Sequence, residues 1–182
     1  MNRANKSQKR TEFIDLVSEA ITHNDIFGTI DYKHKNEDQI KQFIYPHLVE
    51  SLTNYIVEQD GKEKDVAKDY VKKNLKWEGN VNTTVSHILF MGTQNRPDMI
   101  LEMNGLKIAI EFKKGHAGDD LRSGIGQSMI YSTHYDFVLY LFLDTSDDKR
   151  IKNAQDGVNE TEFVDLLWDC LLYTSDAADD LL

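Results

Sequence analysis

The amino-acid sequence predicts an α/β fold in which helices cover both faces of a mixed sheet. Apolar residues recur at helical spacing in several segments between residues 11 and 75, and beyond Trp77 the pattern changes to short runs of strand-forming residues. The chain has 182 residues, of which 40% are hydrophobic and 29% are charged. We therefore expect one soluble globular domain with a real core, and not a disordered or fibrous chain.

Three helices are predicted before Trp77. The first covers residues 11–23, where the apolar side chains share one helix face. The second begins after Asn36, a residue type that caps helices, and it contains Pro46, which should bend this helix or split it in two. The third is more polar, covers residues 62–75 and follows an Asp-Gly turn.

Four strands and two further helices are predicted after Trp77. The strands cover residues 85–91, 97–103, 106–113 and 137–143. One helix, at 119–133, lies between the last two strands, and another starts at 161–168. Strands that alternate with helices in this way are typical of an α/β layout.

The segment 96–113 contains two strand-forming runs joined by Asn-Gly, which is the strongest short signal for a β-hairpin. A two-residue turn at this point places Asp98 opposite Glu111 on one face of the hairpin. Because side chains alternate between the faces of a strand, Lys113 projects from the same face as Glu111. Two carboxylates and one ammonium group are therefore expected to converge.

Asp98 and Glu111 would repel each other at this spacing unless a cation lies beside them, because opposed residues hold their Cβ atoms about 4.5 to 5.5 Å apart. Mg²⁺ prefers oxygen ligands and often takes only one or two protein carboxylates. The pair therefore predicts a Mg²⁺ site, in which Mn²⁺ can substitute. The alternative is a solvent-facing charged cluster on an edge hairpin, in which Lys113 pairs with one carboxylate.

This grouping resembles the motif of the PD-(D/E)XK nuclease superfamily, here a Pro-Asp pair that ends at Asp98, followed by Glu111, Phe112 and Lys113. The resemblance covers about residues 37–143. It implies a three-layer α/β/α core of the restriction-endonuclease type with a mixed sheet. It also implies that Asp98, Glu111 and the carbonyl of Phe112 bind Mg²⁺, and that Lys113 orients or activates the attacking water.

The helix that begins after Asn36 resembles the helix before the sheet in restriction-type members, including the nuclease domain of type I restriction enzymes. That helix carries a glutamate in the family, which nominates Glu37 as an assisting catalytic residue and Glu50 as the second choice. An ordinary first-turn acid, stabilised by the helix dipole, explains Glu37 equally well.

Gln127 and Tyr131 lie four residues apart on one face of the predicted helix 119–133 and resemble the Gln-xxx-Tyr feature of some nuclease branches. This similarity gives Gln127 a catalytic role, while Tyr131, Lys114 and Arg122 are the candidates for contact with nucleic acid. An amphipathic helix with a packed tyrosine and a hydrated glutamine is the alternative for the first pair, and isolated surface charges are the alternative for the cations.

The resemblance implies a metal-dependent nuclease that hydrolyses phosphodiester bonds, most readily those of DNA, with a metal-activated water. The expected partners are DNA and a second copy of the chain or a larger restriction or phage-defence complex. The alternatives are a non-catalytic interaction domain of the same fold, such as an acidic DNA mimic or a structural subunit, and an enzyme that acts on RNA or branched junctions. The net charge of −10 argues mildly against a simple DNA-binding module.

Residues 170–182 resemble the translation of an adapter from a sequencing library, so we expect the native domain within residues 1–169 and a C-terminal truncation. A native helix end is the alternative. The tail contains three aspartates and no basic residue, so residues 1–169 alone carry −7. The sequence shows neither a secretory signal nor an apolar run of about 18 residues, so we expect no membrane contact and a cytoplasmic location.

Overall fold

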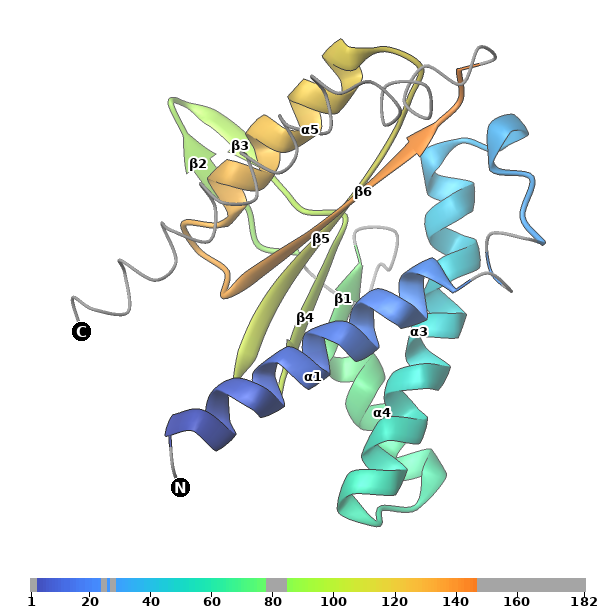
Figure 1. Cartoon of the computed structure of the whole chain (residues 1–182), viewed down its shortest axis with the longest axis vertical. Coiled ribbons are helices and arrows are strands. Elements are labelled where there is room, and N and C mark those ends of the chain that lie inside the picture. Colours follow the sequence, from blue (N-terminus) through green and yellow to red (C-terminus); the bar gives the residue numbers. More distant parts are fainter. Residues whose placement is uncertain (1–2, 24–25, 27–28, 78–84, 147–182) are drawn as a thin grey trace. The chain divides into compact units, whose positions relative to one another are not determined.

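A four-stranded mixed sheet with the order β1-β4-β5-β6 organises the computed structural model, which describes residues 3–23, 26, 29–77 and 85–146 (Figure 1). The chain divides into two units, Met1–Leu143 and Asp144–Leu182, and the elements below belong to the first, apart from the last residue of β6. The helices are α1 (Arg3–Thr22), the short 3-10 helix η1 (Tyr32–His34), α3 (Glu37–Asp60), α4 (Lys64–Asn74) and α5 (Gly118–Tyr131). The strands of the main sheet are β1 (Leu75–Trp77), β4 (Met99–Met103), β5 (Leu106–Gly115) and β6 (Phe137–Asp144), and β2 (Ile88–Phe90) and β3 (Thr93–Asn95) form a separate ribbon. The predicted α/β class is confirmed.

Helix α3 begins where the sequence predicts. The side chain of Asn36 accepts a hydrogen bond from the backbone of Gln39 at 2.8 Å, and the Gln39 side chain accepts one from the backbone of Asn36 at 3.0 Å. This reciprocal pair satisfies backbone donors that a helix start leaves without partners. The helix continues on both sides of Pro46, so the alternative of two separate helices is wrong. The loss of one backbone hydrogen bond at Pro46 is outweighed by a long buried stripe, which includes Ile40, Ile44, Leu48, Leu52 and Ile56.

The β4–β5 hairpin has the predicted register. Its turn residues, Asn104 and Gly105, have positive φ values of 56° and 73°, as a two-residue hairpin turn requires. Met103 pairs with Leu106, and the pairing continues to the opposed residues Met99 and Ile110. One further step along both strands places Asp98 opposite Glu111.

Helices pack against both faces of the sheet, and the two faces contribute to different clusters. The larger cluster joins Met99, Leu101, Ile108 and Ile110 to residues of α1, α3 and α4. The smaller cluster joins Ala109 of β5 to Tyr131 of α5 and Ile88 of β2. Figure 1 shows α5 on the side of the sheet opposite α1 and α3.

Two strands differ from the sequence prediction. Leu75 was expected to end the third helix and residues 76–77 were assigned to no element, but residues 75–77 form β1 and pair antiparallel with β4. The predicted strand at 85–91 is shorter and turns at Met91-Gly92 into β3, which the sequence did not indicate. Three-residue strands gain their stability from pairing rather than from an alternating pattern, so sequence periodicity does not reveal them. The helix predicted to start at 161–168 and the tail 170–182 lie outside the described residues.

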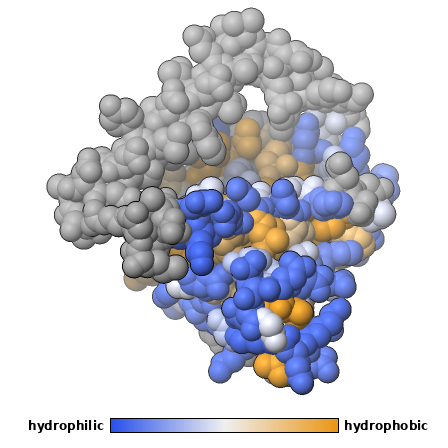
Figure 2. Space-filling model, turned by 60° about the horizontal axis from the view of Figure 1, so that its bottom comes forward, coloured by the Kyte–Doolittle hydropathy of each residue, from blue (hydrophilic) through white to orange (hydrophobic). Residues whose placement is uncertain are grey.

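No helix in the described part of the chain is both long enough and apolar enough to cross a membrane. Figure 2 shows a face on which hydrophilic residues predominate, with smaller apolar groups between them. A few large apolar side chains are exposed, namely Val66, Tyr70, Leu89, Phe90, Met91 and Met129.

Candidate functional site

Asp98 lies immediately before β4, at the end of the hairpin opposite its turn. The backbone N–H of Phe112 donates a hydrogen bond to Oδ2 of Asp98 at 2.8 Å. The ammonium group of Lys41 lies 2.7 Å from Oδ1 of Asp98. Each carboxylate oxygen of Asp98 therefore has a partner, one from β5 and one from α3.

Lys41 is the main site residue that sequence reasoning missed. It is only 6% exposed, and its ammonium also lies 2.9 Å from Oδ1 of Asp38. Burial by itself lowers the pKa of Lys41, but the hydrogen bonds and charges of Asp98 and Asp38 reverse this effect and raise the pKa to about 12. Lys41 is therefore charged at neutral pH. A lysine within the apolar stripe of a helix, three residues after an acid, was the only available signal.

Glu111 is buried, with 6% exposure, and its Oε2 atom has no hydrogen-bond partner in the structure. Burial and the nearby charge of Asp98 raise the pKa of Glu111 to about 8, although the backbone of Asp98, the charge of Lys113 and the hydroxyl of Tyr131 act in the opposite direction. Without a bound cation, Glu111 is therefore largely protonated at neutral pH. The register thus opposes the two carboxyl groups as predicted, but Lys41 and a proton on Glu111 remove the repulsion expected between two carboxylates.

Helix α5 supplies Tyr131 to the same side of the sheet. Its side chain is fully buried, and its hydroxyl donates a hydrogen bond to the carbonyl of Arg96 at 2.8 Å. Burial, followed by the charges of Glu111 and Asp98, raises the pKa of Tyr131, so the phenol stays neutral. Gln127 lies one turn earlier on the same helix face, and its buried Oε1 atom has no hydrogen-bond partner.

Glu37 lies at the start of α3 and reaches β5. Its Oε1 atom accepts a hydrogen bond from the backbone N–H of Lys114 at 2.8 Å. The ammonium of Lys114 donates to the carbonyls of Lys33 and Lys35, both at 2.7 Å. These contacts join the segment before α3 to the strand that carries Glu111. Glu50, the second choice from the sequence, is exposed and lies about 20 Å further along the helix.

The remaining sequence candidates are the cations Lys113 and Arg122. Lys113 is partly buried on β5, and its charge lowers the pKa of Glu111. Arg122 is exposed on α5 and forms an ion pair with Asp119, three residues earlier. Lys113 thus belongs electrostatically to the carboxylate group, whereas Arg122 lies on the solvent-facing side of α5.

Tyr140 of β6 is a second residue that sequence reasoning missed. Burial raises its pKa to about 12, with further contributions from the carboxylates of Glu111, Asp120 and Glu37. Its hydroxyl donates to the carbonyl of Leu121 at 3.3 Å. A Cβ atom at Gly124 would overlap the Tyr140 ring, so glycine at this position allows the ring to lie against α5. A tyrosine in an apolar strand carries no sequence signal for this role.

The carboxylate pair fits a hard divalent cation, such as Mg²⁺ or Mn²⁺, better than a metal that prefers nitrogen or sulfur ligands, such as Zn²⁺. Within the described parts of the chain, no group of three or more His, Cys, Asp and Glu side chains could hold a metal ion. Asp98 and Glu111 instead provide two carboxylates, one of them with a buried oxygen that lacks a partner. Mg²⁺ commonly takes one or two protein carboxylates and completes its coordination with water and phosphate oxygens.

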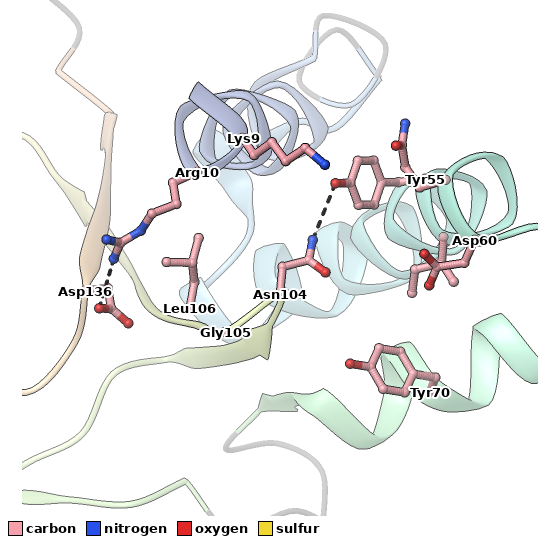
Figure 3. Close-up of a pocket in the computed structure, with 11 residues that line it drawn as sticks. Lys9, Arg10, Tyr55, Asp60, Tyr70, Asn104, Gly105, Leu106 and Asp136 are labelled. Atoms are coloured by element: carbon pink, nitrogen blue, oxygen red, sulfur yellow. Dashed lines mark hydrogen bonds and ion pairs between the residues drawn. The ribbon is translucent and has the colours of Figure 1, made fainter. Parts of the chain in front are cut away.

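A cavity of about 700 Å³ lies at the other end of the hairpin, beside its turn (Figure 3). Its polar groups largely pair with one another, since Arg10 binds Asp136 at 3.1 Å and Asn104 donates to the hydroxyl of Tyr55 at 3.4 Å. None of the sequence-predicted site residues lines it. We therefore place the candidate site at the carboxylate pair, at the opposite end of the hairpin, and not at this cavity.

Comparison with family models, with curated proteins and with solved structures finds no match.

Proposed function

We propose that the protein is a metal-dependent nuclease with a three-layer α/β/α core of the restriction-endonuclease type. The observation that carries this proposal is the buried Glu111, placed opposite Asp98 with one carboxylate oxygen unpartnered and with the charge of Lys113 beside it. An unpaired buried carboxylate is costly, and sites of this kind are common where a cation or a substrate binds. Glu37 supports the same reading, because it contacts β5 three residues beyond Glu111.

Asp98, Glu111 and the carbonyl of Phe112 would hold Mg²⁺ or Mn²⁺. Such a cation, when bound, lowers the pKa of a water molecule and stabilises charge on the phosphorus centre. Lys41 holds the Asp98 carboxylate in place through its 2.7 Å contact. Lys113 orients the attacking water.

The proposed substrate is DNA. Gln127 and Tyr131 lie on the α5 face that supports the site, and Lys114 and Arg122 remain candidates for contact with the phosphate backbone. The ammonium of Lys114 donates two hydrogen bonds to the carbonyls of Lys33 and Lys35, and its third N–H would contact a phosphate oxygen. A restriction or phage-defence complex, or a homodimer that cuts both strands, is the proposed setting.

One observation favours a non-catalytic interaction domain as the second candidate. Asp98 is paired with Lys41, and the raised pKa of Glu111 favours its protonated form, so the two carboxyl groups need no metal to offset negative charge. The acidic chain, with a net charge of −10, agrees with a DNA mimic or a structural subunit. This candidate predicts no affinity for Mg²⁺ at the hairpin.

The decisive experiment is cleavage of supercoiled and linear DNA in the presence of Mg²⁺ or Mn²⁺. Asp98→Asn and Lys113→Ala should abolish cleavage without loss of fold. Lys107→Ala, an exposed lysine at the other end of β5, is the matched control and should retain activity. If the parent protein does not cleave DNA and calorimetry detects no metal binding, the interaction domain becomes the better proposal. RNA and branched-junction substrates are tested before the nuclease proposal is rejected.

A further inference from the structure

The β2–β3 ribbon ends in three consecutive exposed apolar residues, Leu89, Phe90 and Met91, which we call the ribbon tip. Their exposed fractions are 66%, 50% and 90%. Burial of such side chains is normally favourable, so their exposure here is not explained by the folding of the chain. A contiguous group of this kind on a chain rich in charged residues is a feature of binding surfaces.

The backbone conformation of the ribbon tip makes a methionine at position 91 unusual. Met91 and Gly92 form the turn, with positive φ values of 47° and 82°. The first of these positions favours Asn, Asp or Gly, and a methionine with positive φ is strained. Met91 gains no compensating burial within the chain, since it is the most exposed of the three. Folding therefore does not explain a methionine there, whereas contact with a ligand does.

The base of the ribbon is fixed next to the carboxylate pair. Only Arg96 and Pro97 separate the end of β3 from Asp98, a distance of at most about 10 Å along the chain. The carbonyl of Arg96 accepts the 2.8 Å hydrogen bond from Tyr131, which also lies beside Glu111. Ile88 of β2 packs in the same small cluster as Tyr131. A molecule bound at the carboxylate pair would therefore lie close to the ribbon.

The charge of this segment suits a polyanion. Residues 85–97 contain no Asp or Glu, although the chain has 31 acidic residues, and they contain Arg96 and His87. Gln94 is exposed on β3, and amide side chains of this kind can bind base edges and phosphate oxygens. The ribbon is thus a locally non-acidic surface in an acidic protein.

We propose that the β2–β3 ribbon is a further nucleic-acid contact of this protein, and that the ribbon tip packs against bases next to the scissile phosphate. The inference rests on the proposed nuclease function and specifies how its substrate is held. Apolar side chains insert between base steps in other DNA-binding proteins, and aromatic side chains stack on unstacked bases. Phe90 supplies the aromatic surface, and Leu89 and Met91 flank it.

The test measures binding of a fluorescein-labelled DNA duplex and the emission of 2-aminopurine placed in it, both in EDTA so that no cleavage occurs. Phe90→Ser and Met91→Asn should each weaken binding roughly tenfold or more and remove the change in 2-aminopurine emission. Met91→Asn is informative because asparagine suits the turn, so its thermal stability should equal or exceed that of the parent. Val66→Ser, which alters an exposed apolar residue of α4, is the matched control and should bind normally.

The outcomes separate this inference from the proposed function. Cleavage by the parent, combined with unchanged binding by both ribbon variants, would overturn the ribbon inference alone. Ribbon-dependent binding without any metal-dependent cleavage would support the ribbon and overturn the nuclease. If sedimentation shows that the variants convert a dimer to monomers while each chain keeps its DNA affinity, the ribbon is a self-association surface and the inference is wrong.

Discussion

Lys41 and Asp98 form a nearly buried ion pair with a 2.7 Å contact, although 57 residues separate them in the sequence. Lys41 comes from the first turns of α3, and Asp98 precedes β4, so the pair joins the helical half of the chain to the hairpin. It also places the positive charge of Lys41 beside two carboxylates, those of Asp98 and Asp38. The position of Asp98 therefore depends on α3 as well as on the hairpin.

Replacing Lys41 with methionine should destabilise the metal-free protein by about 3 kcal/mol, because removal of one partner leaves the other charge buried without compensation. Mn²⁺ should recover more stability in this variant than in the parent, since the cation supplies the missing positive charge. Urea unfolding with EDTA and with Mn²⁺ measures both effects.

A matched control for Lys41 is available on the neighbouring strand. Lys76 and Glu102 form an ion pair at 2.9 Å, but their side chains are 29% and 33% exposed. Lys76→Met should therefore change stability by less than about 1 kcal/mol. The double variant with Lys41→Met and Asp98→Asn should recover part of the loss. If Lys41→Met and Lys76→Met lower the free energy of unfolding equally, burial does not make the Lys41–Asp98 pair more important than an exposed pair.

The stability of the metal-free protein should fall as pH rises through the range in which Glu111 titrates. Its pKa is about 8 in the folded protein, above the ordinary value of 4.5, so the folded state holds this proton more tightly than the unfolded state. The stabilising contribution is complete below pH 4.5 and is lost as pH rises through about 8, with a total on the order of a few kcal/mol. Glu111→Gln should remove this part of the pH dependence.

Unfolding free energies of the parent and Glu111→Gln, measured in EDTA at several pH values, isolate the contribution of this one group. The difference between the two proteins should change with pH only over the range given by the two pKa values. A difference that stays constant from acid to alkaline pH would show that Glu111 titrates normally. Saturating Mn²⁺ should reduce the loss at high pH, because the cation stabilises the ionised carboxylate.

Local sequence signals predicted the parts of the site that lie on one hairpin. The Asn-Gly turn fixes the register of β4 and β5, and through it the opposition of Asp98 and Glu111 follows by counting. The start of α3 was predictable for the same reason, since the capping residues are adjacent in the chain.

Contacts between distant segments were not predictable from such signals. Lys41 acquires its role only because α3 packs beside the hairpin, and a buried lysine in a helix has no pattern of its own. Tyr140 likewise reaches the site only because β6 lies next to β5. Strand β1 is short and depends on β4 for its hydrogen bonds, so the sequence did not predict it and its first residue, Leu75, was assigned to the end of a helix.

Glu37 should act mainly by positioning β5 rather than by proton transfer. Its Oε1 atom accepts the hydrogen bond from the backbone of Lys114, and glutamine retains an oxygen at that place. Glu37→Gln should therefore keep most of the proposed nuclease activity, whereas Glu37→Ala should lower its kcat on the order of tenfold to a hundredfold by displacing the strand. Glu37→Ala should also cost about 1–2 kcal/mol of stability.

Steady-state cleavage rates and thermal unfolding of the two Glu37 variants distinguish these roles. Glu50→Ala, which removes an exposed acid further along α3, is the control and should leave both measurements unchanged. Loss of activity in Glu37→Gln with normal stability would instead show that the negative charge itself is required. Glu37 would then belong with the metal ligands or the proton-transfer groups.

Gly124 and Gly126 offer a matched pair of substitutions within α5. Alanine is favoured over glycine inside a helix by about 1 kcal/mol, so an unhindered exchange should stabilise the protein. At Gly126 a Cβ atom would meet nothing within 4 Å, whereas at Gly124 it would overlap the ring and hydroxyl of Tyr140. Gly126→Ala should therefore raise stability by up to about 1 kcal/mol, and Gly124→Ala should lower it by about 1–3 kcal/mol.

The same pair tests whether the packing of Tyr140 against α5 supports the carboxylate group. Displacement of Tyr140 moves a neutral phenol that interacts electrostatically with Glu111, so Gly124→Ala should also reduce the proposed DNA cleavage, while Gly126→Ala leaves it unchanged. Combining Gly124→Ala with Tyr140→Leu, which removes the hydroxyl and most of the ring, should restore part of the lost stability because the overlap is relieved. If Gly124→Ala instead matches Gly126→Ala in stability and in cleavage, the contact between Gly124 and Tyr140 does not support the site.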